Sequence, residues 1–358
     1  MRKKLMRILA AQQKELAVEA SRYHRQQLFE PIGENGQDKI ASSHVLVIGV
    51  GALGSASAES LVRAGVGEIT LIDRDYVEES NLQRQQLFTE ADVENKNPKV
   101  IAAKQRLQQI NSKTVIHSLL IDAGVDELER LAPKVDAIVD ATDNFETRLM
   151  INDIAQKYKK PWIYGACVAS YGVTFTVIPG KTPCLQCLMD YIPKDGATCD
   201  TVGIIAPAVQ MVVAHQMTEV LKILVGKEEN LSHKLIGFDV WKNERMELKV
   251  DRLKKPECSS CSKTRTYPNL TYSSQLKTAV LCGRNTVQIR PTHHKQMNFD
   301  NFTKQLMKNK QLQVTKNDYL LAFEIEEHRI VLFKDGRTLI HGTKDIQLAK
   351  KLYYQYVG

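Results

Sequence analysis

One apolar run constrains the fold of this chain more than any other segment. His44-Val-Leu-Val-Ile48 is continuous and ends at Gly49, as a strand buried on both faces of a sheet does. It leads directly into Gly49-Val-Gly-Ala-Leu-Gly54, which matches the pattern G-x-G-x-x-G, and helix-like apolar spacing continues to Ala64. Glycines at these positions permit a tight turn and let phosphate approach backbone N–H groups at a helix start. The segment therefore predicts a nucleotide-binding unit of strand, loop and helix.

The strand signal recurs along the chain and alternates with helix-like stretches. Residues 172–178 alternate between apolar and polar, which is typical of an antiparallel strand. Residues 33–36, which contain Gly and Asn, predict a loop. The fold class that we expect is α/β: a doubly wound, mostly parallel Rossmann-like sheet with an antiparallel extension. Buried strands are predicted over 68–73, 114–121, 137–140 and 161–166, and helices over 98–111 and 206–225.

The chain divides into three expected parts. Residues 1–21 would form an amphipathic helical extension, 22–265 the nucleotide-binding domain, and 266–358 a small α+β domain of unknown role. The boundary falls in the segment 256–268, where Cys, Pro and Ser interrupt the apolar periodicity. In the last part, strands are predicted over 279–290, 319–325 and 328–333, helices over 301–308 and 344–356, and a tight turn at Glu326-Glu327.

Composition and charge disfavour several classes of protein. Of the 358 residues, 43% are hydrophobic and 25% are charged, and the longest apolar runs are too short or too interrupted to span a bilayer. Near the N-terminus, the apolar stretch is too short for a signal peptide. The net charge of +8 comes without a long Lys/Arg run interleaved with aromatic residues, so it fits an acidic protein partner or a nucleotide as well as nucleic acid. We expect a cytoplasmic protein that binds neither membrane nor nucleic acid.

Four of the seven cysteines form two C-x-x-C pairs, Cys184 with Cys187 and Cys258 with Cys261. A gap of two residues lets adjacent thiolates converge on one zinc ion, and four thiolates close the coordination sphere. Such a metal would stabilise the fold and leave the chemistry to other residues. A redox-active pair and two unrelated turns are the alternatives, although prolines beside both pairs favour knuckle turns. Cys167 lies in an apolar run and is expected in the core.

Charged residues follow several of the predicted strands. Asp73 and Asp75 close the second strand, Arg84 and Lys99 come in the next connection, and Asp143 follows a later strand. Asp73 is placed to accept a hydrogen bond from a ribose hydroxyl. The carboxyl ends of parallel strands meet at one edge of a sheet, so the set combines cations and carboxylates as a triphosphate with a divalent metal requires. An NAD-dependent oxidoreductase, the usual meaning of the glycine loop, needs a base and a small oxidisable substrate instead.

Several segments together resemble the MoeB/ThiF family, bacterial relatives of the ubiquitin-activating enzymes. The resemblance covers residues 22–262 and implies a homodimeric, ATP-dependent adenylyltransferase that releases pyrophosphate. Its substrate would be the C-terminal glycine of a small ubiquitin-like sulfur-carrier protein, ThiS-like or MoaD-like, in thiamine or molybdopterin cofactor biosynthesis. The matching segments are Arg22-Tyr-His-Arg-Gln26, Gly49-Val-Gly-Ala-Leu-Gly54, Asp73-Arg-Asp75, Ser80-Asn-Leu-Gln-Arg84, Pro98-Lys99, Ala141-Thr-Asp-Asn144, Thr198-Cys-Asp200 and both cysteine pairs.

The resemblance also implies roles for individual residues. Arg25 would reach across the dimer to the phosphates, Asp143 would hold magnesium, and Arg84 and Lys99 would neutralise phosphate oxygens. Cys199 would form a covalent bond with the activated carrier in the thiamine branch, whereas the molybdopterin branch can dispense with it. A cysteine desulfurase or another sulfur donor would be a further partner. The residues implied around ATP are Gly49, Gly51, Ala52, Gly54, Asp73, Asp75, Ser80, Asn81, Leu82, Gln83, Arg84, Lys99, Asp143 and Asn144.

Some alternatives stay open from the sequence. The stretch Glu94-Asn-Lys-Asn97 lengthens the spacing between Arg84 and Lys99 relative to the family, so Lys96 competes for the role of phosphate-binding lysine. A tRNA-modifying dehydratase or a peptide adenylase would share much of the site. An inactive scaffold is a further alternative, against which the presence of Arg84, Lys99 and Asp143 counts. No motif identifies the carrier.

Overall fold

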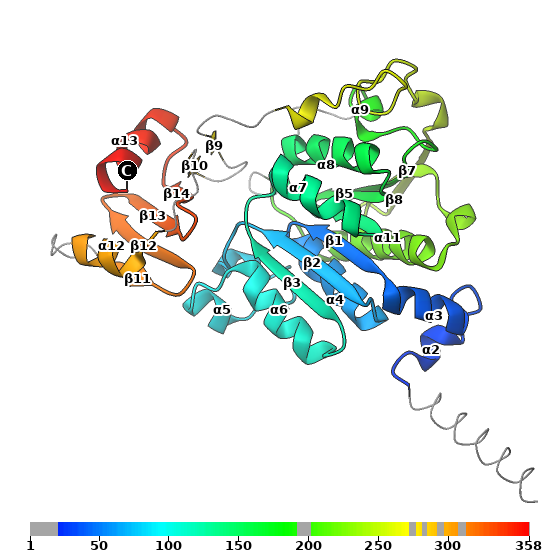
Figure 1. Ribbon diagram of the computed structural model, residues 1–358, viewed down its shortest axis with the longest axis horizontal. Helices are drawn as coiled ribbons and strands as arrows, with labels where there is room; N and C mark the ends of the chain where they lie inside the picture. The colour runs from blue at the N-terminus through cyan, green and yellow to red at the C-terminus, as the bar shows by residue number, and fades with distance from the viewer. Residues whose placement is uncertain are drawn as a thin grey trace, which may run out of the picture.

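The computed structural model describes residues 21–191, 202–271, 277–280, 285–291, 297–306 and 313–357. Two β-sheets organise them, and Figure 1 shows the two bodies side by side, the C-terminal one in orange and red. The first sheet has eight strands in the order β3-β2-β1-β4-β5-β6-β7-β8, and the second has six in the order β11-β12-β13-β14-β10-β9. The predicted N-terminal extension lies outside the described residues.

The first sheet is parallel from β3 to β5 and antiparallel from β5 to β8. This arrangement confirms the predicted doubly wound sheet with an antiparallel extension. The parallel strands were predictable because they are buried on both faces and read as continuous apolar runs. The strands are β1 (His44–Ile48), β2 (Glu68–Asp73), β3 (Val115–Leu120), β4 (Ala137–Asp140), β5 (Trp162–Val168), β6 (Tyr171–Val177), β7 (Lys234–Asp239) and β8 (Glu244–Lys249).

Helices cover both faces of this sheet. On one face α3 (Gly33–Ser42), α4 (Ala52–Ala64), α6 (Lys99–Ile110) and α11 (Ala206–Val225) form one hydrophobic core, and on the other α7 (Val125–Leu131), α8 (Phe145–Tyr158) and α9 (Leu185–Leu188) form a second. The shorter helices are α2 (His24–Gln27), α5 (Glu90–Glu94), η1 (Glu79–Asn81), η2 (Ala132–Lys134), η3 (Glu228–Asn230), η4 (Asp251–Leu253) and η5 (Pro268–Leu270).

The loop predicted over residues 33–36 is wrong, because α3 begins at Gly33. Gly36 is buried in this helix, where a Cβ would lie 3.1 Å from Cγ1 of Val225 at the end of α11. Glycine there permits two helices to approach closely, a use that the sequence does not distinguish from a turn.

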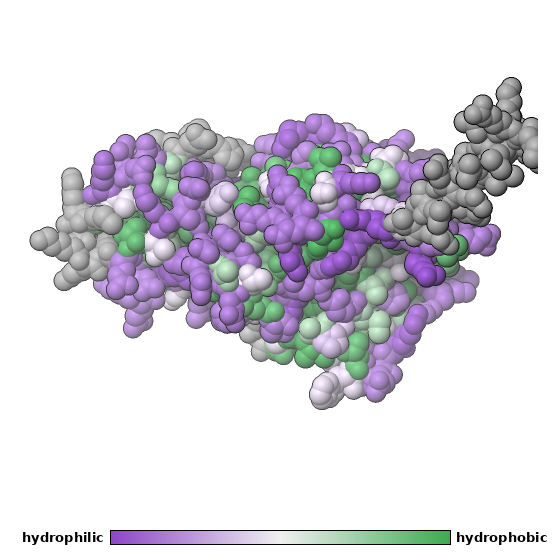
Figure 2. All heavy atoms as spheres, turned by 90° about the horizontal axis from the view of Figure 1, so that it is seen from below, coloured by the Kyte–Doolittle hydropathy of each residue, from purple (hydrophilic) through white to green (hydrophobic). Residues whose placement is uncertain are grey.

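Helix α11 is long and apolar enough to cross a membrane by length and composition, the one such helix in the described part of the chain. More than half of its most apolar window is buried, and the helix packs against α4 and against strands β5 and β6. It therefore has the surroundings of a core helix. The face of the molecule in Figure 2 is mainly hydrophilic, with hydrophobic residues in separate patches.

The second sheet is antiparallel throughout and carries helices on one face only. The single strand predicted over 279–290 is wrong, since β9 and β10 pair with each other there. Gly283 and Asn285, both turn formers, fall between them in sequence. The elements are β9 (Lys277–Val280), β10 (Thr286–Arg290), α12 (Phe299–Leu306), β11 (Val314–Lys316), β12 (Leu320–Ile325), β13 (His328–Phe333), β14 (Thr338–His341) and α13 (Ile346–Tyr356).

Candidate functional site

The glycine loop joins β1 to α4 and needs glycine for packing at its two ends. Gly49 has a φ of 89°, and a Cβ there would lie 2.6 Å from the carbonyl oxygen of Ala141. A Cβ at Gly54 would lie 1.9 Å from the carbonyl oxygen of Gly49. At Gly51, by contrast, the nearest atom to an added Cβ is Nε2 of Gln85 at 3.8 Å, so the middle of the loop is packed less tightly than its ends. This middle part lies at the N-terminus of α4, where backbone N–H groups can receive phosphate.

The strand order places a second loop beside the first. Because β1 lies between β2 and β4, the chain winds outward in both directions from this point, and ligands of open α/β sheets bind at such a switch. The loop 141–144 follows β4 and meets the end of β1, where the Ala141 N–H donates to the Ile48 carbonyl over 2.9 Å. Both loops therefore lie together at the carboxyl edge of the sheet, at the switch point where folds of this type form their ligand crevice.

Three charged side chains meet at the end of β2. Asp73 accepts hydrogen bonds from the backbone N–H of Val50 (2.6 Å) and of Asp75 (2.7 Å). Nζ of Lys99 lies 3.5 Å from Oδ2 of Asp75, and the Lys99 side chain is only 4% exposed. Burial raises the pKa of the Asp73 carboxyl, Lys99 opposes this shift, and Asp75 adds to it. The buried lysine is thus the cation that two crowded carboxyl groups share.

Backbone pairing sets the position of Lys99. The Lys99 N–H donates to the Asp75 carbonyl over 2.9 Å, and Tyr76 forms an isolated bridge with Pro98. Lys96 has different neighbours, Arg329 and Glu324 of the C-terminal domain. Burial and Arg329 lower the pKa of its amine, and Glu324 opposes this shift. Of the two candidate lysines, Lys99 is therefore the one among the acidic residues.

The segment after Asp75 folds back toward the glycine loop through η1. Asn81 is buried, and its Oδ1 accepts a hydrogen bond from the Glu78 N–H over 3.1 Å. Arg84 is partly exposed, and its Nη1 donates to the Ser80 carbonyl over 2.7 Å. Gln83 is exposed, whereas Leu82 packs against the hydrophobic core. Asn81 and Leu82 therefore shape the segment from which Arg84 extends.

Asp143 is exposed in the loop after β4, as a magnesium-binding carboxylate should be. Its neighbour Asn144 caps α8 by accepting a hydrogen bond from the Thr147 N–H over 2.9 Å, and donates to Oδ1 of Asp143 over 3.3 Å. A single exposed carboxylate suits Mg²⁺, which keeps waters and completes its shell with substrate phosphates.

A buried ion pair that sequence reasoning missed holds the Asp143 loop. Nε of Arg148 lies 3.3 Å from Oδ2 of Asp140, and Nη2 of Arg148 donates to the Thr142 carbonyl over 2.6 Å. The Thr142 N–H and hydroxyl both donate to Oδ1 of Asp140, over 2.9 and 2.7 Å. A charge at the end of a buried strand, with an arginine about one turn into the following helix, was the available signal.

Arg74 is a second missed residue, although it lies between two predicted ones. Its Nη1 is 3.2 Å from Oδ1 of Asp122, which follows β3. Burial alone would lower the pKa of this guanidinium. The negative charges around it outweigh burial and raise the pKa; they belong to Asp122, Asp75, Asp143 and Asp73. Arg74 thus stays charged and balances the carboxylates of the crevice.

Two predicted catalytic residues lie elsewhere. Arg25 is exposed on α2, and the adjacent Gln26 side chain donates to the Ala64 carbonyl at the C-terminal end of α4. The glycine loop lies at the opposite end of that helix, about 20 Å away at 1.5 Å per residue. Arg25 therefore does not reach the crevice of its own chain. Cys199 lies outside the described residues, and Cys167 packs partly buried against the core.

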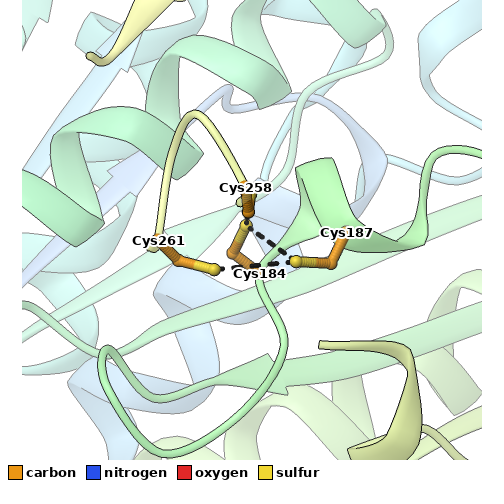
Figure 3. A group of neighbouring side chains, drawn as sticks. All are labelled: Cys184, Cys187, Cys258 and Cys261. Atoms are coloured by element: carbon orange, nitrogen blue, oxygen red, sulfur yellow. Dashed lines mark hydrogen bonds between the residues drawn. The ribbon is translucent and has the colours of Figure 1, made fainter. Parts of the chain in front are cut away.

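The four paired cysteines come together at the far end of the sheet. Figure 3 shows Cys184 and Cys187, from the segment of α9, facing Cys258 and Cys261 from the loop after η4. All four sulfurs lie within 4.8 Å of one another, and three pairs are 3.5, 3.6 and 3.8 Å apart. A tetrahedron of sulfurs around zinc, with bonds of about 2.3 Å, has edges of about 3.8 Å. The donor set and its spacing fit zinc.

The four thiols divide into two kinds: the pKa is lowered at Cys187 and Cys258 and raised at Cys184 and Cys261. A hydrogen bond from the Cys184 thiol lowers the pKa of Cys187 to about 6, and the backbone N–H of Lys255 donates to Sγ of Cys187 over 3.4 Å. Thiolate is the form that binds metal. With all four positions held by protein, zinc here would contribute stability and leave no open position for a substrate.

Comparisons with known proteins agree with this geometry. A sulfur carrier protein ThiS adenylyltransferase of Bacillus subtilis (strain 168) is 52% identical over 337 residues, covering 94% of this chain and 99% of the relative. A molybdopterin-synthase adenylyltransferase of Escherichia coli (strain K12) is 35% identical over 248 residues, covering 68% of this chain and 96% of the relative. The crystal structure of E. coli MccB with ATP has a TM-score of 0.56 at 26% identity and covers 64% of this chain and 69% of that one. Residues 23–260 match the ThiF family, and the chain belongs to that family.

Proposed function

We propose that this protein catalyses the ATP-dependent adenylylation of the C-terminal glycine of a ThiS-like sulfur carrier. The extent of the two alignments carries the choice of carrier. The ThiS adenylyltransferase aligns over 94% of this chain, so the alignment has to include most of residues 266–358. The molybdopterin-synthase adenylyltransferase aligns over 68%, which leaves almost a third of the chain unmatched. The C-terminal domain therefore accompanies the thiamine branch in these comparisons.

The reaction needs alignment and charge neutralisation more than covalent help from the protein. The triphosphate lies on the glycine loop, with the ribose at Asp73, and the carboxylate of the carrier attacks the α-phosphorus. Pyrophosphate leaves, and an acyl-adenylate remains. Lys99 and Arg84 supply positive charge to the phosphates. Magnesium, when held by Asp143, supplies further positive charge.

A homodimer would complete each site with Arg25 of the second chain. Its distance from its own glycine loop supports a role in trans. Leu28 and Phe29, on the same segment, are 63% and 61% exposed, which is unusual for large apolar side chains and supports burial against a partner. An ATP-consuming enzyme with reduced thiols suits the cytoplasm.

The decisive experiment is ATP–pyrophosphate exchange with purified carriers. With a ThiS-like carrier we expect exchange at least about tenfold faster than with a MoaD-like carrier, because the missing carrier contacts lower kcat/KM. Carrier truncated by its terminal glycine is the control and should support no exchange. Faster exchange with the MoaD-like carrier would reverse the choice, and no exchange with either would defeat the proposed function.

A second expectation concerns Cys199 and the sulfur donor. The Cys199 thiolate would attack the carbonyl carbon of the acyl-adenylate and form a thioester as AMP leaves, before a cysteine desulfurase or another donor completes sulfur transfer. We expect mass spectrometry to detect a conjugate of enzyme and carrier in the presence of ATP. The conjugate should disappear in Cys199→Ala and persist in Cys167→Ala. Unchanged sulfur transfer by Cys199→Ala would remove the covalent role.

A further inference from the structure

Arg337 is buried in a way that its own domain does not explain. It lies in the turn between β13 and β14, is 0% exposed, and its Cζ is 3.7 Å from the centroid of the Phe333 ring. Its Nε is 3.7 Å from Oδ2 of Asp335, yet none of its three guanidinium nitrogens donates a hydrogen bond to a described residue. A guanidinium has five N–H donors, and burying it unsatisfied is unfavourable. An apolar residue of similar volume would be at least as stable there.

The surroundings of Arg337 belong to the nucleotide-binding crevice. The sheet face that carries it packs on Tyr76, the residue after Asp75. Thr338, the next residue, pairs with Ile289, and the neighbouring Arg290 side chain donates to the Asp122 carbonyl, so the turn of Arg337 lies on the Asp122 side of the site. Burial lowers the pKa of Arg337; Asp335, Asp122 and Asp75 oppose this shift, and Arg74 adds to it. The residues of the second sheet that pack with Tyr76 are Leu320, Ala322, Val331, Phe333 and Leu339.

The C-terminal domain also binds the loop that leads to Lys99. Nδ2 of Asn317 donates to the carbonyls of Asn95 and Lys96, over 3.0 and 3.2 Å. These carbonyls lie in the stretch between Arg84 and Lys99 that is expected from the sequence to be longer than in the family. The C-terminal domain thus holds the loop that leads to Lys99.

A third contact reaches the partner of Arg74. Nε2 of Gln288 donates to Oδ2 of Asp122 over 2.8 Å, and Nη2 of Arg290 donates to the Asp122 carbonyl over 2.7 Å. Asp122 forms the ion pair with Arg74, which balances the carboxylates of the crevice. Three separate contacts of the C-terminal domain therefore end on segments that carry or adjoin Asp75, Lys99 and Arg74.

We propose that the C-terminal domain is a positioning element of the adenylylation site, and that Arg337 is its central residue. This inference rests on the proposed function. Arg337 shares the negative charge of Asp75 with Lys99 and so weakens the attraction that holds Lys99 to that carboxylate. Lys99 can then turn toward a phosphate oxygen when ATP binds. Without Arg337, Asp75 would keep Lys99, and the affinity for ATP would fall.

Arg337→Met in the full chain tests this positioning role. Removing the charge while keeping the volume should leave Tm unchanged or higher. We expect calorimetric affinity for ATP–Mg to fall about tenfold and kcat/KM for ATP in carrier-dependent exchange to fall at least as far, in line with losses from a displaced catalytic group. The KM for the carrier should not change, a split that a merely structural role would not produce.

Matched variants separate charge from structure. Arg337→Lys keeps the charge and should retain ATP affinity within about threefold of wild type; equal loss in both variants at unchanged Tm would overturn the proposal. Lys334→Met removes a cation from the same turn, where Nζ faces the Phe299 ring of its own domain, and should bind ATP normally. ATP affinity of Arg337→Met within twofold of wild type would also overturn it. If wild type binds ATP but exchanges with no carrier, the proposed function fails, while the affinities still decide the role of Arg337.

Discussion

Lys99→Ala is expected to abolish carrier-dependent ATP–pyrophosphate exchange, with a fall of at least about 100-fold in kcat/KM. Its amine is the buried cation beside Asp75 and Asp73, and no other described lysine lies among these carboxyl groups. Removing it leaves two acidic groups without that cation, which repels an incoming triphosphate. The measurement is exchange of labelled pyrophosphate into ATP by purified protein, with circular dichroism to verify folding.

Lys96→Ala is the matched control for this experiment. Lys96 lies three residues away but beside Arg329 and Glu324 of the C-terminal domain, and its contact with Asn317 is through its backbone carbonyl. Its side chain should be dispensable, with exchange within about twofold of wild type, as for most surface substitutions. A Lys99→Ala protein that is folded and exchanges normally would remove Lys99 from the site. Loss of exchange in Lys96→Ala alone would transfer the role to that residue.

The sequence was sufficient to predict the parts of the fold that local patterns determine. The strand of His44 is a continuous apolar segment because it is buried on both faces, and the helix from Ala206 has a long apolar stripe because one side of it packs against the sheet. The two cysteine pairs carry their chemistry in their spacing, and the structure brings all four sulfurs within 4.8 Å. These features depend on residue types close together in the chain.

Features that depend on pairing over long distances were not predictable. Strand β8 is exposed at every residue, and its short alternation of Met246 and Leu248 with charged residues faces no core, so its pairing with β7 is what makes it a strand. Gly36 could be assigned to a helix only from its contact with Val225. The loop predicted over residues 33–36 was therefore wrong because Gly36 is there for close packing of two helices and not for a turn.

The site divides in the same way. Asp73, Lys99 and Asp143 were predicted because each follows a strand or begins a helix at the carboxyl edge of the sheet. Arg74 and Arg148 were missed, since an arginine that follows or precedes charged and polar residues in sequence is usually a solvated surface residue. Arg337 is about 260 residues beyond Asp75 in sequence, and only the docking of the second sheet on Tyr76 brings it near. A charged residue whose partners are distant in the chain cannot be recognised from its neighbours in sequence.

Cys258→Ala is expected to cause the largest loss of stability in this chain. Purified wild type should contain about one zinc per chain by elemental analysis, and the variant close to none, because three thiolates leave the tetrahedron incomplete. Structural zinc contributes about 10–16 kcal/mol to folding in small zinc peptides, comparable to or larger than the 5–15 kcal/mol that keeps a typical domain folded. We expect a sharply lower Tm and loss of most folded protein at 37 °C.

Two controls connect this loss to the metal itself. Cys167→Ala removes a partly buried thiol on β5 outside the cluster, and should keep its zinc and lose far less stability. A chelator added to wild type should lower Tm as Cys258→Ala does, and added zinc should restore it. The four sulfurs connect the segment before α11 to the loop after β8, so without the ion this end of the antiparallel extension loses its cross-link, while the glycine loop and Lys99 keep their own contacts. Folded wild-type protein with almost no metal would disprove the zinc assignment, because the four thiols, all within 4.8 Å of one another, would then be stable without a cation.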